Sequence, residues 1–266
     1  MVNKFSDHNF FNFNNKRIYV LGGSGLIGTQ IVKSLLKLGA KVISLDLVNN
    51  FKNKSNNLYY VKFDILNSLS DNYTVNDLFS KYGKPYAFIN CSYPKITNGK
   101  SGSFKKNTFS NLKDNIHIHL LSYSNISKLV ANFMVKHKIN GKILLFSSLY
   151  GFQGQDLNLY NDTKMTESMN YSITKGGIIN LVRQMAGYYG QFGININCIS
   201  PGGVLEPVSS NRPQDKIFLN NYSLKTPLGR LAYPHEIAYF SIFLISKHAD
   251  YITGSNQIID GGISIV

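Results

Sequence analysis

Hydrophobic and polar residues alternate along the chain in two kinds of block. Seven short, continuously apolar runs predict buried strands at Arg17–Leu21, Lys41–Leu45, Leu58–Phe63, Ala87–Asn90, Lys142–Ser147, Ile194–Ser200 and Gln257–Asp260. Longer amphipathic stretches predict helices at Thr29–Leu38, Leu112–Lys136, Met169–Tyr189 and Pro234–Ser246. Continuous apolar strands that alternate with helices are typical of a parallel sheet with helices on both faces. The pattern therefore predicts a doubly wound α/β fold with a seven-stranded, mostly parallel sheet.

Two polar segments interrupt this alternation, at residues 93–111 and 152–170. Loops of this length in a compact domain are usually functional, and both follow predicted strands at the sheet edge where ligands bind. They are rich in Asn, Gln, Tyr, Thr and Lys, which favours a hydroxyl-rich or anionic substrate over a steroid or fatty acyl chain. Solvated loops that never touch substrate are the alternative. Residues 1–15 are also polar, so we expect an N-terminal extension before a single domain at residues 16–266.

The formal charge of +14 raises the question of a nucleic-acid partner. Only four of the 28 basic residues are arginines, and the lysines are scattered along the whole chain. Proteins that read bases and phosphates favour the bidentate arginine fork. We therefore expect no nucleic-acid partner.

Cysteine placement and the N-terminus bear on the compartment. Cys91 and Cys198 lie in apolar, strand-like runs, which favours reduced core thiols over a disulfide. The first residues contain no continuous apolar stretch of the kind that a secretory signal needs. No run reaches the roughly 18 apolar residues of a membrane-spanning helix. We expect a cytoplasmic protein that works without a membrane.

A glycine-rich turn joins the first predicted strand to the first predicted helix. Its residues include, in order, Gly22, Ser24, Gly25, Leu26, Ile27 and Gly28. Glycines permit a tight turn, and a helix N-terminus attracts a pyrophosphate, so we expect this Rossmann-type turn to bind a dinucleotide. Asp46 follows the next strand, 24 residues after Gly22. An acid there accepts hydrogen bonds from ribose hydroxyls and repels a 2′-phosphate, which favours NAD over NADP; an ordinary turn with a solvent-facing Asp46 is the alternative.

The sequence "YSITK" places Tyr171 and Lys175 on one face of a predicted helix. A tyrosine hydroxyl alone titrates near 10, too high for a good base at neutral pH. An ammonium group alongside favours the phenolate and lowers the tyrosine pKa, which makes Tyr171 a usable general acid and base. By itself this pair is a weak signal, because such pairs arise often by chance on helix surfaces.

Further motifs follow in a fixed order along the chain. They are Asp64-Ile65, "INCS" from Ile89, "FSSLYG" with Ser148, "INCISPGGV", and the stretch from "TPLGRLAYPHEIAYFSIFLIS" to "YITGSNQIIDGG". In motif order and spacing, the chain resembles the short-chain dehydrogenase/reductase family, single-domain type, from about Lys16 to Ile265. The C-terminal stretch is the most specific part, because it follows the family signature almost position for position.

This resemblance implies roles for three residues. Tyr171 exchanges a proton with the reacting oxygen of the substrate while hydride moves to or from the nicotinamide. Lys175 hydrogen-bonds the nicotinamide ribose and lowers the pKa of Tyr171. Ser148 positions and polarises the reacting oxygen; the alternative for Ser148 is a strand-end serine that satisfies backbone groups.

The resemblance also implies cofactor contacts and an assembly. Besides the glycine turn and Asp46, the expected cofactor-binding residues are Asp64, Ile65, Asn90, Cys91, Ser92, Tyr171, Lys175, Pro201, Gly202 and Val204. Family members are often dimers or tetramers built through two long helices, here Leu112–Lys136 and Met169–Tyr189. We expect a homodimer or a homotetramer with a small-molecule substrate.

The chain departs from the family pattern at four points. Its Gly-x-x-Gly-x-x-Gly spacing is typical of the extended branch of the family, which handles nucleotide sugars. His119 stands where the family has a proton-relay asparagine, either as a catalytic replacement or as a packed core histidine. An insertion separates Ser148 from Tyr171, and Glu206 replaces a threonine that commonly follows the Pro-Gly turn.

The pair His117 and His119 could suggest a metal site. Residues two apart on a helix diverge by about 200°, and no cysteine or carboxylate cluster accompanies the pair. We therefore expect no metal.

The glycine turn, the "INCS" strand end and "CISPGGVLE" are together most similar to dehydrogenases of flagellin and surface-glycan sugar modification. We expect an NAD-dependent oxidoreductase that acts on a secondary alcohol or ketone of a polar, sugar-like metabolite. Two alternatives are a non-catalytic dinucleotide-binding subunit or sensor, and a general carbonyl reductase such as a 3-oxoacyl-type reductase.

Overall fold

The computed structural model describes residues 11–52, 55–70, 73–94, 102–206 and 214–266. Within these ranges the centre is one sheet in the order β3-β2-β1-β4-β5-β6-β7. The strands are β1 (Arg17–Leu21), β2 (Lys41–Asp46), β3 (Leu58–Lys62), β4 (Ala87–Asn90), β5 (Lys142–Phe146), β6 (Asn195–Pro201) and β7 (Asn256–Ile259). Every neighbouring pair is parallel. The predicted doubly wound Rossmann fold is confirmed, and this sheet is wholly parallel.

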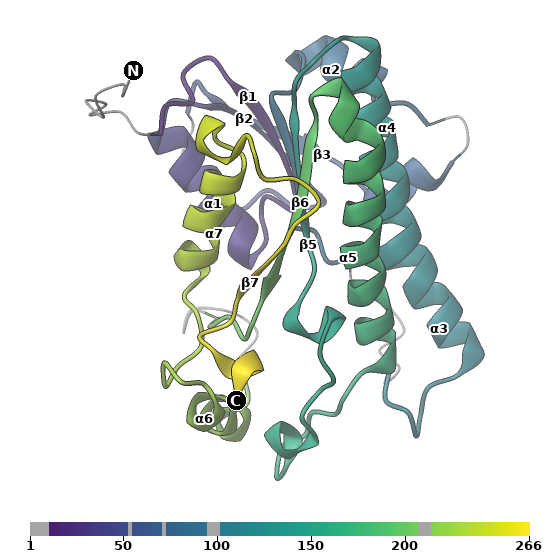
Figure 1. The fold of residues 1–266 in the computed structure, drawn as a ribbon, viewed down its shortest axis with the longest axis vertical. Helices are drawn as coiled ribbons and strands as arrows, with labels where there is room; N and C mark the ends of the chain where they lie inside the picture. The colour runs from purple at the N-terminus through teal and green to yellow at the C-terminus, as the bar shows by residue number, and fades with distance from the viewer. Residues whose placement is uncertain (1–10, 53–54, 71–72, 95–101, 207–213) are drawn as a thin grey trace.

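Helices cover both faces of the sheet (Figure 1). On one face α1 (Leu26–Lys37) packs against α7 (Pro234–Leu244), and on the other α4 (Ser122–Lys136) packs against α5 (Met169–Tyr189). The shorter helices and turns are α2 (Asn76–Tyr82), α3 (Phe109–Asn115), α6 (Lys216–Lys225), η1 (Ile65–Leu69), η2 (Ile116–Leu121), η3 (Leu149–Gly151), η4 (Leu157–Tyr160), η5 (Gly190–Phe192), η6 (Lys247–Ala249) and η7 (Ile263–Ile265).

Each face of the sheet has its own core, because successive side chains of a strand point to opposite faces. In β1, Ile18 and Val20 join the cluster under α1 and α7. Tyr19 and Leu21 join the cluster under α4 and α5. All four side chains are buried. Burial on both faces explains why the strands are continuously apolar in the sequence.

Several predicted boundaries were wrong by one residue, because a strand end depends on ladder hydrogen bonds that composition does not determine. The observed strands end at Asp46, Lys62, Phe146, Pro201 and Ile259, and β6 and β7 begin at Asn195 and Asn256. Helix α1 begins at Leu26, before the predicted Thr29, and α7 ends at Leu244. The sequence interpretation missed α2 and α6, which are short and carry many polar residues.

The helix predicted at Leu112–Lys136 is present, but it begins earlier, at Phe109, and contains a π-helical turn that was not predicted. It consists of three consecutive segments: α3, the π-helical turn η2, and α4. A π-helical turn bonds residue i to i+5 and often marks a functional site, because it changes which side chains face inward. Here His119 is buried while its neighbour His117 is exposed.

The packed part of the chain begins before residue 16. The Phe13 side chain is 2% exposed and belongs to the core under α1 and α7. Its backbone N–H donates to the Leu38 carbonyl at 3.1 Å, which fixes this segment against the end of α1. Residues 1–10 of the expected extension lie outside the described residues.

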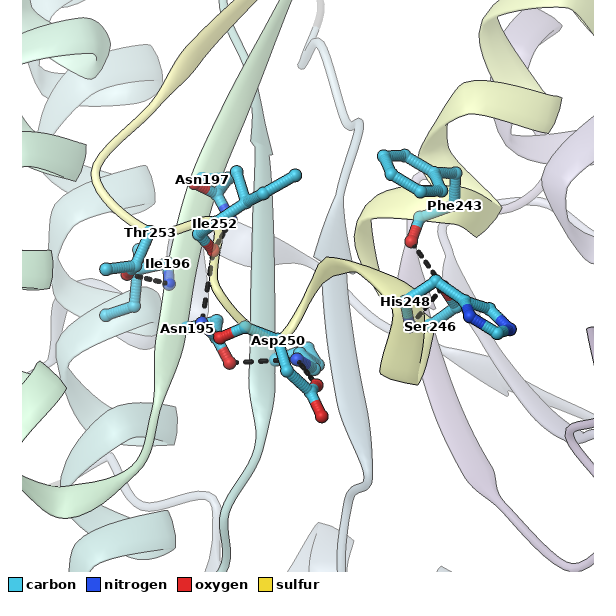
Figure 2. Close-up of polar contacts among 10 residues, drawn as sticks. Asn195, Ile196, Asn197, Phe243, Ser246, His248, Asp250, Ile252 and Thr253 are labelled. Atoms are coloured by element: carbon cyan, nitrogen blue, oxygen red, sulfur yellow. Dashed lines mark hydrogen bonds and ion pairs between the residues drawn. The ribbon is translucent and has the colours of Figure 1, made fainter. Parts of the chain in front are cut away.

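A polar cluster fixes the start of β6 to the segment before β7 (Figure 2). The side-chain amide of Asn195 donates to the carbonyls of Asp250 at 2.9 Å and Ile252 at 3.1 Å. Its oxygen accepts from Nζ of Lys142 at 2.8 Å, and Lys142 also forms an ion pair with the Asp250 carboxylate. Asn197 donates to the Ile252 carbonyl at 2.8 Å. This cluster lies at the amino ends of the strands.

None of the helices in the described ranges combines the length and apolar character that crossing a bilayer requires.

Candidate active site

The sequence-predicted site residues gather at the carboxyl ends of the strands, where doubly wound sheets bind ligands. They follow six strands, namely Gly22–Gly28 after β1, Asp46 at the end of β2, Asp64 and Ile65 after β3, Asn90–Ser92 at β4, Ser148 after β5, and Pro201–Val204 at β6. Helix α5 adds Tyr171 and Lys175, and the π-helical turn η2 adds His119.

The turn after β1 leaves no room for side chains at two of its glycines. Gly22 has a φ of +82°, and a Cβ there would lie 2.6 Å from Cα of Ser92. A Cβ at Gly28 would lie 2.0 Å from the Gly22 carbonyl oxygen. Gly25 donates its N–H to that same oxygen at 3.0 Å. The glycines thus bring β1, β4 and α1 close together.

Helix α1 begins directly behind this turn, at Leu26 and Ile27. No side chain of the described residues caps its first turn, and that turn contains no acidic residue. The first N–H groups of a helix have no partners within the helix, so they attract an anion. The turn and the helix start therefore fit a phosphate group.

Asp46 is fastened to the glycine turn. Its Oδ2 accepts from the backbone N–H of Ser24 at 2.9 Å, and its Oδ1 accepts from the N–H of Val48 at 3.4 Å. The Ser24 hydroxyl donates to the Val48 carbonyl at 2.7 Å. These bonds hold a carboxylate beside the predicted phosphate site, which suits a ribose diol and repels a 2′-phosphate.

Asp64 and Ile65 lie at the end of the neighbouring strand β3. The Asp64 carboxylate caps η1 by accepting from the backbone N–H of Leu66 at 3.0 Å. Ile65 is 4% exposed and belongs to the core under α4 and α5. Both residues flank the edge where an adenine ring would lie if the cofactor binds as the family resemblance implies.

At the end of β4, Asn90 is completely buried. Its side-chain oxygen accepts from the N–H of Ser92 at 3.2 Å and from the Ser92 hydroxyl at 2.7 Å. Its amide nitrogen has no hydrogen-bond partner among the described residues. A buried amide donor without a partner is costly, so its position at this edge indicates a group that accepts from it.

Cys91 lies between these two residues. Its Sγ donates to the Leu21 carbonyl at 3.3 Å. Burial raises the pKa of the Cys91 thiol to about 12. The thiol is therefore protonated at neutral pH and is not a nucleophile.

The Pro-Gly turn after β6 is closely packed. Gly202 donates its N–H to the Ile259 carbonyl at 2.9 Å, and a Cβ at Gly202 would lie 2.9 Å from Cα of Asp260. Val204 forms an isolated bridge with Ala232. Helix α6 also holds this turn, because the backbone N–H of Gly203 donates to the Tyr222 hydroxyl at 2.6 Å.

Ser148 and Tyr171 face each other at the centre of this edge. Ser148 caps η3 and accepts from the N–H of Tyr150 at 3.3 Å. Burial raises the pKa of Tyr171, and a hydrogen bond with the Ser148 side chain acts in the opposite direction. The net direction is upward, which is opposite to the expectation from the sequence.

The state of Lys175 explains that difference. Its side chain is buried, and its Nζ donates to the Phe146 carbonyl at 2.9 Å. Burial also lowers the pKa of Lys175 to about 8. Desolvation is therefore the largest effect on the pKa of each group, and it favours the uncharged form of both.

His119 is packed and neutral in this structure. Its side chain is 3% exposed, and its Nδ1 has no hydrogen-bond partner among the described residues. Burial, together with the charge of Lys175, lowers the pKa of His119 to about 4. The ring is part of the core, as the interpretation of a packed histidine predicted. Its Nδ1 has no partner among the described residues, so a catalytic role also remains a prediction.

Sequence reasoning missed two tyrosines of this site. The Tyr93 ring stacks on His119 at 4.4 Å between centroids and lies edge-on to Tyr171 at 5.8 Å. Nζ of Lys175 lies 5.5 Å from the centroid of Tyr93 and 5.8 Å from that of Tyr123. The available signal for Tyr93 was its place directly after "INCS", at the end of a strand that leads into the site.

The two polar loops touch each other beside Tyr171. Met169 donates its N–H to the Gly102 carbonyl at 3.0 Å, and Phe104 donates its N–H to the Glu167 carboxylate at 3.1 Å. The side chains of Asn107 and Asn170 form an amide pair at 2.7 and 3.2 Å. Residues 95–101 of the first loop lie outside the described residues.

The arrangement combines a phosphate-binding turn, a ribose-binding acid, and a serine, tyrosine and lysine at one sheet edge. These features define a dinucleotide-dependent oxidoreductase fold. A family model described as "Enoyl-(Acyl carrier protein) reductase" matches residues 24–264. The chain belongs to the short-chain dehydrogenase/reductase family of oxidoreductases.

Individual relatives agree with this assignment. The chain is 26% identical to "Post-translational flagellin modification protein A" of Campylobacter coli, over 93% of this chain and 98% of the relative. It is also 26% identical to acetoacetyl-CoA reductase of an Acinetobacter strain, over 92% and 96%. A short-chain dehydrogenase of Leptospira borgpetersenii, solved with bound NAD+, superposes with a TM-score of 0.84 at 30% identity, covering 99% of this chain and 97% of that one.

Proposed function

We propose that the protein is an NAD-dependent oxidoreductase that interconverts a secondary alcohol and a ketone on a polar, sugar-like metabolite. The observation that carries this proposal is the meeting of Ser148, Tyr171 and Lys175 beside a glycine turn to which Asp46 is fastened. This is an arrangement of proton-transfer groups next to a dinucleotide cradle.

The residues at the sheet edge fit NAD. Gly22 and Gly28 allow the tight turn that brings β1, β4 and the start of α1 together, and Asp46 would accept hydrogen bonds from the adenosine ribose. The unpartnered amide of Asn90 provides a further donor at the same edge. When bound, NAD supplies the hydride acceptor or donor. The NAD-bound Leptospira relative supports this cofactor.

The chain's own residues then handle the proton. Because burial raises the pKa of Tyr171, its hydroxyl is protonated at neutral pH and can donate to a carbonyl oxygen. In the opposite direction Tyr171 first releases its proton to solvent, and the phenolate oxygen then takes the proton of the alcohol. Ser148 donates to the same oxygen and orients it, and Lys175 holds its ammonium group beside the tyrosine. Nζ of Lys175 lies 5.6 Å from the centroid of the Tyr171 ring.

The loops beside Tyr171 support a polar substrate. Residues 102–108 and 152–170 meet through amide and carboxylate groups such as the Asn107–Asn170 pair and Glu167. Such groups bind hydroxyls well and an acyl chain poorly. The relative named for flagellin modification is consistent with this class of substrate.

A substrate panel tests the proposal. The purified protein is mixed with NAD+ or NADH and a set of sugar phosphates, nucleotide sugars and free sugars, and NADH absorbance is followed. We expect hydride transfer with at least one member of the panel. Turnover of 3-oxoacyl thioesters alone would instead favour the alternative of a 3-oxoacyl-type reductase, which the acetoacetyl-CoA reductase relative keeps open.

Two substitutions test the mechanism. Tyr171→Phe removes the proton donor, and Lys175→Ala removes the buried ammonium, so we expect each to lower kcat by about 10²–10⁴-fold. NADH fluorescence titration and circular dichroism check that the variants still fold and bind. If both variants keep full turnover, the assigned chemistry is wrong. If the wild type binds NADH and turns over no substrate, the protein is a non-catalytic dinucleotide-binding subunit.

A further inference from the structure

Tyr93 occupies a position of the site that the proposed mechanism does not use. It follows β4 directly after Ser92, and its side chain is 54% exposed. Its ring meets the ring of Tyr171 edge-on, at 5.8 Å and an interplanar angle of 68°.

One face of the Tyr93 ring is covered by another side chain. It stacks on His119 with 4.4 Å between centroids and an interplanar angle of 14°. His119 is fixed in turn, because it is buried in the π-helical turn η2. The stacking therefore holds the Tyr93 ring in one orientation, with Nζ of Lys175 at 5.5 Å from its centroid, while the residue stays 54% exposed.

The exposed part of Tyr93 lies beside Tyr171, whose hydroxyl a substrate must reach. A substrate whose oxygen reaches the hydroxyl of Tyr171 places the adjoining carbon atoms within a few ångströms of the Tyr171 ring. Tyr93 borders that ring. Any carbon skeleton attached to the reacting carbon on that side therefore meets the Tyr93 ring.

We propose that Tyr93 is a specificity-determining residue whose exposed ring surface packs against the ring of a cyclic polyol. A saturated six-membered ring presents a flat set of C–H groups that can cover an aromatic face. An open chain of similar composition covers less of it and loses more rotational freedom on binding. Tyr93 thereby selects cyclic over acyclic alcohols. This inference rests on the proposed function, since it names the substrate class of the same site.

The test compares two simple probes, trans-cyclohexane-1,2-diol and butane-2,3-diol. Their binding to the full chain with NAD+ is measured by saturation-transfer NMR titration in the Tyr171→Phe background, where proton transfer is blocked. We expect the cyclic diol to bind at least fivefold more tightly than the acyclic diol. Adding Tyr93→Phe keeps the ring and the preference, whereas adding Tyr93→Leu brings the two affinities within twofold.

Tyr251→Leu is the matched control, because Tyr251 is a fully exposed tyrosine at the start of the segment before β7. It leaves the preference unchanged, and circular dichroism verifies that each variant folds. If the Tyr93→Leu protein still binds the cyclic diol at least fivefold more tightly, the proposal is overturned. The same holds if the protein with Tyr93 intact does not prefer the cyclic diol. Because the readout is binding, it is separate from the turnover that tests the proposed function.

Discussion

Burial has a larger effect than neighbouring charge on the ionisation of the groups around Tyr171. It raises the pKa of Tyr171, lowers that of Lys175 to about 8, and lowers that of His119 to about 4. In each case the shift favours the uncharged form, as desolvation requires. The site is therefore a poorly hydrated pocket in which protons are held on tyrosine and withheld from histidine.

His119 makes folding stability depend on pH. Its pKa is about 4 in the folded chain and about 6.5 in an unfolded one. Between these values the unfolded chain binds a proton that the folded chain does not, so stability falls as pH decreases from 6.5 to 4. We expect His119 to account for a loss of about 2 kcal/mol between pH 7 and pH 5.

Urea unfolding of the wild type and of His119→Asn at both pH values measures this contribution. The variant should lose about 2 kcal/mol less on acidification than the wild type. His117→Asn, at an exposed position of the same segment, is the control and should behave as the wild type does. An equal pH dependence in the His119→Asn protein would show that the histidine is already protonated or solvated.

Residue roles were only partly predictable from the sequence. The pairing of Tyr171 with Lys175 was predictable, because helix periodicity brings positions i and i+4 together. The direction of the Tyr171 pKa was not, because it depends on how much water the folded site excludes. Tyr93 was also missed, because its contacts with His119 join segments that are distant in the chain.

At the scale of elements, the end of β2 and the turn after β1 work as one unit. Asp46 accepts from the N–H of Ser24, so the acid that we propose contacts the ribose also orders the glycine turn. A substitution at the end of β2 is therefore expected to change the conformation of the turn that precedes α1. Periodicity predicts both elements but not the hydrogen bond that connects them.

Asp46→Ala tests this unit. It removes the ribose acceptor and the repulsion of a 2′-phosphate, so we expect about tenfold weaker NADH binding and a smaller penalty for NADPH. The measurement is the ratio of the NADH and NADPH dissociation constants from fluorescence titration. Asp215→Ala, which removes the cap of α6, is a control that should leave the ratio unchanged. An unchanged ratio in Asp46→Ala would mean that this carboxylate does not contact the ribose.

The element pattern was largely predictable because the strands are buried on both faces and read as apolar runs. The short helices α2 and α6 escaped prediction, since their few turns bury one or two side chains each. The break within the helix predicted at Leu112–Lys136 also escaped it. A π-helical turn adds a residue without changing composition.

At the scale of the whole molecule, Lys142 and Asp250 connect parts of the chain that are far apart in sequence. The Lys142 side chain is 5% exposed, whereas that of Asp250 is 69% exposed. Removing the carboxylate leaves a buried charge with Asn195 as its partner, while removing the lysine leaves a carboxylate that water can reach. We expect Asp250→Ala to cost about 1–2 kcal/mol and Lys142→Met less than that.

Urea unfolding at pH 7 measures both changes and the double variant. The double variant should be closer to Lys142→Met than to Asp250→Ala, because it contains no buried charge. A larger loss for Lys142→Met would mean that the lysine stem stabilises the fold by packing rather than by charge.

The outer face of α4 and α5 bears on assembly. Leu121, Ile173 and Tyr188 are 45%, 41% and 57% exposed, and a cavity of about 510 Å³ beside Leu181 and Met185 opens on this face. Apolar side chains gathered in this way favour contact with a second copy of the chain. We propose a homodimer or homotetramer built through these two helices, as the family resemblance implies.

Light scattering after size exclusion tests that assembly. Tyr188→Glu places a charge on the shared face, so we expect the mass to fall to that of a smaller species. Tyr239→Glu changes an exposed tyrosine on α7, the opposite face of the sheet, and separates a general charge effect from a local one. A wild-type protein that runs as a monomer would contradict the proposed assembly.

The π-helical turn η2 makes the site sensitive to chain length. Deleting one residue between Ile116 and Leu121 would restore the ordinary α-helical repeat and turn α3 by about 100° relative to α4. The new repeat would carry His119 out from under Tyr93 and would also move Leu120, which packs against the core under α4 and α5. Natural variants that lack a single codon here should therefore be less stable and should differ in the alcohols they accept.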